Sequence, residues 1–114
     1  MPARLKVLFV CAMNKQRSVT AERLYRNDAR LEVRSAGVNA KAARRISEAD
    51  LNWADLVYVM ESDQKTWIRS RFPDLDLPKI EVLDIPDEFH AMDAELQAML
   101  RAMLDPEFDL LCGE

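Results

Sequence analysis

A cysteine near the start of the chain has neighbours that suit a nucleophile acting on phosphate. Cys11 ends an apolar run, and the pair Arg17-Ser18 begins six residues further along. A thiolate at Cys11 would attack phosphorus, while the planar guanidinium of Arg17 would bind two phosphate oxygens at once. The hydroxyl of Ser18 would donate a hydrogen bond to the sulfur. The residues whose backbone N–H groups would surround the anion are Ala12, Met13, Asn14, Lys15 and Gln16.

The predicted elements on either side of this loop place Cys11 at the edge of a sheet. Residues 7–10 are apolar and predict a buried strand, whereas residues 18–25 predict the start of a helix. Cys11 then stands at the carboxyl end of a strand, where open α/β sheets bind ligands. The positive end of the helix and Arg17 both favour the thiolate form of a cysteine. The plainer alternative, a small buried cysteine near a solvated arginine, is disfavoured because this spacing in a strand-loop-helix context rarely arises by chance.

Length and composition limit the classes of protein that this chain can be. At 114 residues it is expected to form a single domain over residues 1–114, and its net charge of −4 disfavours nucleic acid as a partner. No apolar stretch is long enough to cross a bilayer and no signal peptide precedes the first strand, so we expect no membrane association and a cytoplasmic protein. One histidine and two cysteines predict no metal site, and the two glycines exclude the dinucleotide and NTPase loop motifs. We therefore expect no cofactor.

The rest of the chain alternates between expected strands and helices. After the first pair, strands are predicted over residues 31–35, 55–60 and 79–83, and helices over residues 47–53, 62–71 and from 93 onward. This order predicts an α/β fold, a single-domain sandwich with a four-stranded parallel sheet flanked by helices on both faces. Ser47 and Asp50 predict a capping box at the second helix, and the residues after Pro106 remain unassigned. The stripe of the last helix that is predicted to enter the core comprises Leu96, Met99, Leu100, Met103 and Leu104.

An acidic loop follows the last predicted strand. Residues 84–89 have the sequence Asp-Ile-Pro-Asp-Glu-Phe. Loops that follow parallel strands share one edge of the sheet, so this loop is expected to meet the Cys11 loop there. It would bring a carboxylate to the phosphate site, where general acid catalysis needs one.

Together these segments resemble the low-molecular-weight protein tyrosine phosphatase family, most closely its short bacterial branch of predicted tyrosine phosphatases. The resemblance covers most of the chain and rests on ordered motifs at residues 7–22, 34–37, 54–60 and 84–89. It implies a cysteine-dependent phosphomonoester hydrolase that acts through a phosphocysteine intermediate without a metal. The implied substrate is a phosphorylated protein or a small phosphomonoester.

The resemblance also implies roles for the matching residues. Cys11 corresponds to the nucleophile, and Arg17 to the residue that binds the phosphate and its transition state. Asp87 corresponds to the general acid, with Asp84 as the second candidate. Ser18 corresponds to the hydroxyl that steadies the thiolate.

Three further residues have supporting roles by the same resemblance. Asn14 and Ser35 correspond to a pair whose hydrogen bonds hold the loop backbone. Asparagine also tolerates the left-handed conformation that such a loop requires. Phe89 corresponds to an aromatic wall beside the substrate ring.

The sequence departs from the family pattern around the site. Met13 replaces a glycine, Gln16 replaces the second cysteine of the loop, and Glu88 replaces the proline after the acid. The segment after Gly37 also lacks residues that wall the substrate cleft in longer relatives. These departures leave the physiological substrate, the efficiency of turnover and the oligomeric state open.

Three other functions remain as alternatives. An arsenate reductase-like enzyme would use the same loop but needs a further cysteine, for which Cys112 is the sole candidate. A catalytically weak phosphate-binding domain would keep the loop without turnover, a possibility raised by the departures above. A phosphocarrier is disfavoured because Arg17-Ser18 and Asp87 would promote hydrolysis of the thiophosphate that a carrier must preserve.

Overall fold

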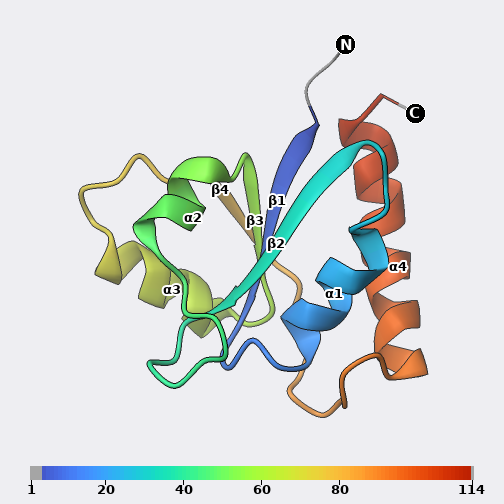
Figure 1. Ribbon diagram of the computed structural model, residues 1–114, viewed down its shortest axis with the longest axis horizontal. Coiled ribbons are helices and arrows are strands. Elements are labelled where there is room, and N and C mark those ends of the chain that lie inside the picture. Colours follow the sequence, from blue (N-terminus) through green and yellow to red (C-terminus); the bar gives the residue numbers. More distant parts are fainter. Residues whose placement is uncertain (1–3, 114) are drawn as a thin grey trace.

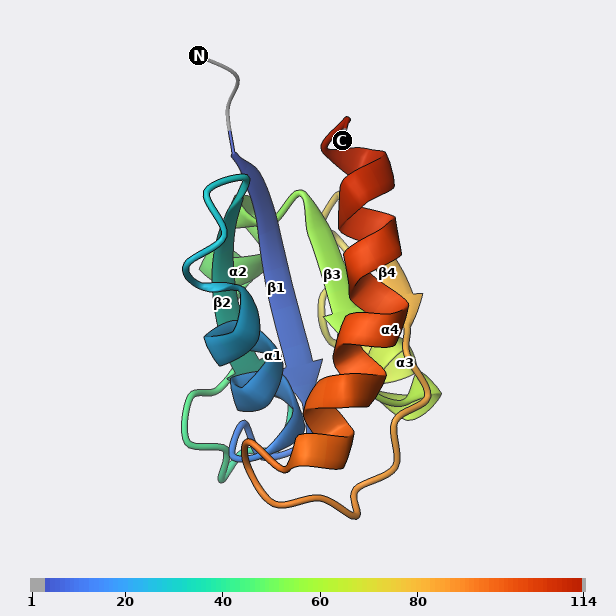
Figure 2. The same ribbon diagram turned by 90° about the vertical axis from the view of Figure 1, so that its right-hand side faces the viewer.

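The computed structural model describes residues 4–113, in which four strands and four helices alternate along the chain. The elements are, in order, β1 (Leu5–Cys11), α1 (Arg17–Tyr25), β2 (Leu31–Gly37), α2 (Glu48–Trp53), β3 (Leu56–Val59), α3 (Ser62–Arg71), β4 (Lys79–Val82) and α4 (Ala94–Leu111). The strands form one parallel sheet in the order β2-β1-β3-β4. Helices α1 and α4 cover one face, and α2 and α3 cover the other (Figures 1 and 2). The predicted fold class is therefore confirmed.

Strand β1 lies at the centre of the fold because both of its neighbours are strands. It pairs with β2 along its whole length and with β3 over its apolar run. The run is fully buried because helices cover both faces, which explains why its hydrophobicity is continuous rather than alternating. Val7 and Phe9 enter the core beneath α1 and α4, whereas Leu8 and Val10 enter the core beneath α2 and α3. The same run carries Cys11 to the carboxyl edge of the sheet.

Aromatic side chains fill the core beneath α1 and α4. The ring of Phe9 stacks near those of Tyr25 and Tyr58, with centroid distances of 6.3 and 5.8 Å. Phe108 of α4 meets the two tyrosine rings edge-on, at 5.0 and 5.9 Å. The Tyr58 hydroxyl donates to Glu107 over 2.8 Å, and burial raises the pKa of Tyr58 well above its ordinary value. Ring packing and this hydrogen bond together fix α4 to the sheet.

Helix α4 continues past Pro106 to Leu111, over residues that the sequence left unassigned. Proline removes one backbone donor from a helix. Two residues later, however, Phe108 is fully buried in the aromatic core, and this burial stabilises the turn that follows the proline. Among residues 4–113, even this longest helix lacks the apolar run that spanning a bilayer requires.

The predicted apolar stripe of α4 needs a correction at its methionines. Met103 is 40% exposed and Met99 is only partly buried. The buried line runs through residues four apart, so Phe108 is the member that the prediction missed. The fully buried leucines of this line are Leu96, Leu100 and Leu104.

Truncation of Phe108 to alanine should destabilise the protein by about 3–5 kcal/mol, because it removes a fully buried ring and leaves a cavity. Leu110 lies on the same helix but is 82% exposed, so Leu110→Ala should change the free energy of unfolding by less than about 0.5 kcal/mol. Urea unfolding of the two variants measures this difference. Equal losses would show that Phe108 does not anchor α4.

Helix α2 begins with the predicted capping box. The Ser47 hydroxyl accepts from the backbone N–H of Asp50 over 3.3 Å, and the Asp50 carboxylate accepts from the backbone N–H of Ser47 over 3.1 Å. Asp50 is buried and also pairs with Arg44, which donates to the Ser35 carbonyl oxygen over 2.7 Å. The segment between β2 and α2 is thereby tied to the sheet.

Candidate active site

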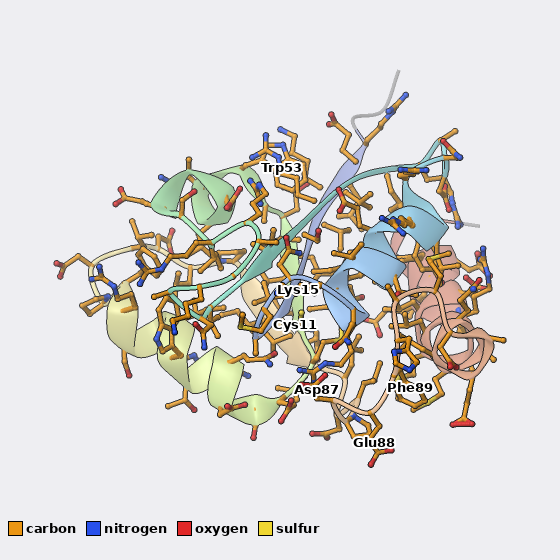
Figure 3. All side chains as sticks on the ribbon, turned by 60° about the horizontal axis from the view of Figure 1, so that its bottom comes forward. Cys11, Lys15, Trp53, Asp87, Glu88 and Phe89 are labelled. Carbon is orange, nitrogen blue, oxygen red and sulfur yellow. The ribbon has the colours of Figure 1, made fainter. Side chains whose placement is uncertain are left out.

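Loops that follow β1 and β4 meet at the carboxyl edge of the sheet and enclose a small cavity. Its volume is about 80 Å³, enough for an anion of a few heavy atoms. In Figure 3, Cys11 lies between Lys15 and Asp87. The structure thus brings together two motifs that are far apart in the sequence. The residues that line the cavity are Cys11, Met13, Lys15, Gln16, Arg17 and Asp87.

The Cys11 thiol is buried and lies beside two hydrogen-bonding groups. Its Sγ accepts from the backbone N–H of Asn14 over 3.2 Å and lies 3.0 Å from the Ser18 hydroxyl oxygen. The side-chain amide of Asn14 donates to the same Ser18 oxygen over 3.0 Å. The Ser18 proton is therefore left to be donated toward the sulfur. Two donors directed at one sulfur stabilise negative charge on it.

The loop backbone bends at Asn14, whose φ is 55°. Asparagine enters this left-handed region more readily than most residues, in agreement with the expectation from sequence. Gly37, at the end of β2, has no side chain, so the bend in the Cys11 loop can lie close to β2. A Cβ at this position would lie 2.6 Å from the Ala12 carbonyl oxygen and 3.0 Å from the Asn14 nitrogen. Any side chain at Gly37 would therefore push the loop away from β2.

The segment after β2 braces the loop through its carbonyl oxygens. The backbone N–H of Asn39 donates to the Ala12 carbonyl, and that of Ala43 donates to the Met13 carbonyl, each over 3.0 Å. The backbone N–H of Val38 donates to the carbonyl of the nucleophile candidate over 3.1 Å. Three carbonyl oxygens that would repel an anion are thus already paired with donors.

Arg17 lines the cavity from a buried position. It is 2% exposed, and its Nη1 donates to the Glu61 carboxylate over 2.5 Å and to the Ile85 carbonyl over 2.8 Å. Its Nε lies 3.8 Å from Oδ1 of Asp87. A buried guanidinium needs partners that replace its lost hydration. These contacts fix the guanidinium where an anion in the loop would meet it.

Glu61 is the residue of this site that sequence reasoning did not identify. It follows β3 at the same carboxyl edge, and its backbone N–H donates to the side chain of Gln64 over 3.1 Å. Its own side chain is 44% exposed and holds the buried Arg17. The signal that could have identified it is an acidic residue that closely follows a strand paired with β1.

Glu61→Ala should destabilise the protein by about 1–3 kcal/mol, because the buried Arg17 charge loses its closest partner. Inorganic phosphate in the loop would supply replacement charge, so it should raise the melting temperature of the variant more than that of wild type. Thermal unfolding with and without phosphate measures both effects. Asp63→Ala, which removes an exposed acid from the first turn of α3, is the control. An equal phosphate effect in Glu61→Ala and wild type would contradict this role.

The two candidate general acids lie in different surroundings. Asp87 lines the cavity, and its side chain is 58% exposed near the Arg17 guanidinium. Asp84 is exposed, does not line the cavity, and has a φ of 55° where the chain leaves β4. Because Asp87 lines the cavity and Asp84 does not, Asp87 is the carboxyl group that we retain as the predicted proton donor.

Among the described residues, no group of three or more carboxylate, cysteine or histidine side chains is placed to hold a metal ion.

Of the two residues that the resemblance implies as holding the loop backbone, Asn14 makes hydrogen bonds within the loop and Ser35 bonds elsewhere. Its hydroxyl donates to the Glu22 carboxylate over 2.5 Å, whereas the Asn14 amide donates to Ser18. The side chain of Glu22 on α1 thus reaches β2 and accepts the hydrogen bond from Ser35. Ser35 therefore links α1 to β2 beside the loop instead of holding the loop directly.

Phe89 does not form the aromatic wall that was expected. Its side chain packs against the core beneath α4, where burial of an apolar ring is favourable, and it does not line the cavity. Figure 3 shows Phe89 well to one side of Cys11, with Asp87 nearer. The residues that line the cavity therefore include no aromatic side chain.

Cys112 lies at the opposite end of the sheet from Cys11. It follows α4 and, with Arg4 and Leu5 near the start of β1, lines a larger cavity of about 650 Å³. Strand β1 separates the two thiols, and seven residues of strand span roughly 20 Å. Cys112 is therefore not placed to react with an oxidised Cys11, which removes support for the arsenate reductase-like alternative.

Solved structures share this fold over nearly the whole chain. The arginine phosphatase YwlE from Geobacillus stearothermophilus is 27% identical, with a TM-score of 0.70 over 96% of this chain and 91% of that one. SP-PTP, a low molecular weight protein tyrosine phosphatase from Streptococcus pyogenes, is 19% identical, with a TM-score of 0.78 over 94% and 93%. The tyrosine phosphatase Wzb from Escherichia coli K30, solved with phosphate, is 19% identical, with a TM-score of 0.73 over 96% and 99%. No protein-family model and no curated protein matches the chain.

Proposed function

We propose that this chain, which shares the fold of low-molecular-weight protein tyrosine phosphatases, is a member of that family and hydrolyses phosphomonoesters through a phosphocysteine. The observation that carries the proposal is the setting of Cys11. Its sulfur is buried between two hydrogen-bonding groups and shares with the buried Arg17 a cavity that suits a small anion. A nucleophile, a fixed cation and paired loop carbonyls are what phosphoryl transfer requires of a protein.

In the first step, the Cys11 thiolate attacks phosphorus and the bond from phosphorus to the ester oxygen breaks. Negative charge spreads over the equatorial oxygens, where Arg17 and the loop N–H groups stabilise it. The protonated carboxyl group of Asp87 gives its proton to the departing oxygen. The alcohol or phenol leaves, and the phosphoryl group remains on Cys11.

In the second step, water attacks the phosphocysteine and the sulfur–phosphorus bond breaks. The Asp87 carboxylate accepts the proton of the attacking water, which returns the acid to its starting form. The Asn14 N–H and the Ser18 hydroxyl stabilise the sulfur as the leaving group. Inorganic phosphate is released and the thiolate is restored.

Phosphotyrosine in a protein is the first candidate substrate. Phosphoarginine is the second; it is a phosphoramidate, so its phosphorus–nitrogen bond would break and the proton of Asp87 would go to the departing nitrogen. The second is supported by the 27% identity to an arginine phosphatase and by the lining of the cavity, which includes no aromatic side chain. We further expect the protein to act in the cytoplasm, since a reducing compartment keeps Cys11 and Cys112 as thiols. A small phosphomonoester is the alternative to a phosphorylated protein.

Hydrolysis of p-nitrophenyl phosphate in the presence of a chelator tests the proposed reaction. We expect turnover between about pH 5 and 7 that the chelator leaves unchanged and that vanadate inhibits. Absence of turnover with phosphate still bound would contradict the proposal and favour a phosphate-binding domain.

If p-nitrophenyl phosphate is hydrolysed, phosphotyrosine and phosphoarginine peptides of the same sequence distinguish the two candidate substrates.

A further inference from the structure

We infer that Lys15 is a substrate-binding residue that selects phosphorylated polypeptide segments with an acidic residue next to the phosphorylated one. The inference rests on the proposed phosphatase function and names the substrate class of the same site. Lys15 is exposed and lines the cavity that holds Cys11. Among residues 4–113, none of the ion pairs involves Lys15, whereas Arg17 is paired with Glu61 and Asp87. The Lys15 ammonium group is therefore the positive charge of the lining that is not paired with a protein carboxylate, and it is available to a substrate group other than the phosphate that Arg17 binds.

Positive charge continues from Lys15 onto the segment after β2. This segment is hydrogen-bonded to the loop through the carbonyl oxygens of Ala12 and Met13. It carries the exposed side chain of Lys41, whereas the exposed Arg45 lies beside α3. A second exposed positive charge outside the cavity, on the segment that braces its loop, suits a polypeptide better than a small molecule.

Negative charge gathers on the other side of Cys11. Asp87 and the exposed Glu88 lie on that side in Figure 3, opposite Lys15. Glu61 does not line the cavity, and its charge is paired with that of Arg17. The exposed charges beside Cys11 are therefore positive on the Lys15 side and negative on the side of Asp87 and Glu88.

A phosphorylated segment whose phosphate lies in the cavity would pass between the positive side at Lys15 and the negative side at Asp87 and Glu88. An acidic side chain next to the phosphorylated residue is attracted to the Lys15 side, whereas a basic side chain at the same place is repelled by it. Exposed ion pairs are weak, so the expected preference is about two- to fivefold in kcat/KM for each pair of charges. Salt should weaken it, because the Debye length falls to about 3 Å at 1 M ionic strength.

Three phosphotyrosine peptides that differ only in the residue after phosphotyrosine, Glu, Gln or Lys, test the inference. Wild type should hydrolyse the Glu peptide fastest and the Lys peptide slowest at low salt. Lys15→Gln should reduce the ratio of kcat/KM between the Glu and Lys peptides, and Lys15→Glu should reverse it. Lys79→Gln is the matched control, since Lys79 is exposed at the opposite end of the strands and should leave the ratio unchanged.

The same peptides should be measured as ligands of the Cys11→Ser protein, which provides a readout that needs no turnover. Affinities in the order Glu, Gln, Lys that depend on Lys15 would support the inference even if the proposed hydrolysis failed. Hydrolysis of p-nitrophenyl phosphate together with equal rates and affinities for the three peptides would overturn the inference and leave the proposed function intact. A ratio of kcat/KM between the Glu and Lys peptides that is the same in wild type, Lys15→Gln and Lys15→Glu would also overturn the inference.

Discussion

Replacement of Cys11 by serine is expected to abolish hydrolysis of every phosphate ester, with a loss on the order of 10⁴-fold or more in kcat. A serine hydroxyl in the same place is a far weaker nucleophile than a thiolate. The groups that bind the anion remain, because Arg17 and the loop N–H groups do not depend on the sulfur. Phosphate should therefore still protect the variant against thermal unfolding.

Cys112→Ser is the matched control for this experiment. Both thiols are free, but Cys112 lies at the far end of β1 and lines a different cavity. Its replacement should leave kcat and KM for p-nitrophenyl phosphate unchanged. Activity of Cys11→Ser within tenfold of wild type, or a loss in Cys112→Ser instead, would contradict the assignment of the nucleophile.

Asp87→Asn is expected to lower kcat by about 10²–10⁴-fold for an ester with a poor leaving group, because the departing oxygen then receives no proton. The loss should be smaller for p-nitrophenyl phosphate, whose leaving group needs less protonation. Asp87 lies in the cavity and Asp84 does not. The dependence on the leaving group separates loss of an acid from a general disturbance of the loop.

Asp84→Asn is a suitable control because asparagine also tolerates the positive φ found at position 84. It should leave the rates for both kinds of ester close to those of wild type. A larger loss in Asp84→Asn than in Asp87→Asn would show that the other carboxyl group is the acid. Steady-state rates with phenyl phosphate and p-nitrophenyl phosphate provide the comparison.

The part of the site that could be predicted from sequence is the part that local structure determines. A continuous apolar run ends on Cys11, and Asn14 supplies the residue type that a left-handed bend requires. The capping box of Ser47 and Asp50 likewise depends on residues three apart. Each of these features can be read within a short window of the chain.

The features that were missed depend on contacts between distant segments. Glu61 meets Arg17 across 44 positions, and nothing near either residue specifies their pairing. Ser35 was expected to hold the loop, but its hydroxyl donates a hydrogen bond to Glu22 on the covering helix. Phe89 was expected beside the substrate, but its ring packs against the core. In each case the packing of α1, α3 or α4 against the sheet decided the partner.

The charges around the cavity also combine local sequence with contacts between distant segments. The sequence places Lys15 in the phosphate loop, but the structure is needed to show which charged segments lie beside that loop. The chemistry that we propose therefore rests on Cys11 and Arg17, whereas the proposed choice of substrate rests on the residues that surround them.

Detection of the phosphoenzyme tests the central claim most directly. Protein mixed with p-nitrophenyl phosphate and quenched rapidly is digested and analysed by mass spectrometry under conditions that preserve thiophosphate. We predict one phosphoryl group on the peptide that contains Cys11, present in Cys112→Ser and absent in Cys11→Ser. Turnover without any phosphoenzyme, or with the phosphoryl group on another residue, would contradict the proposed mechanism.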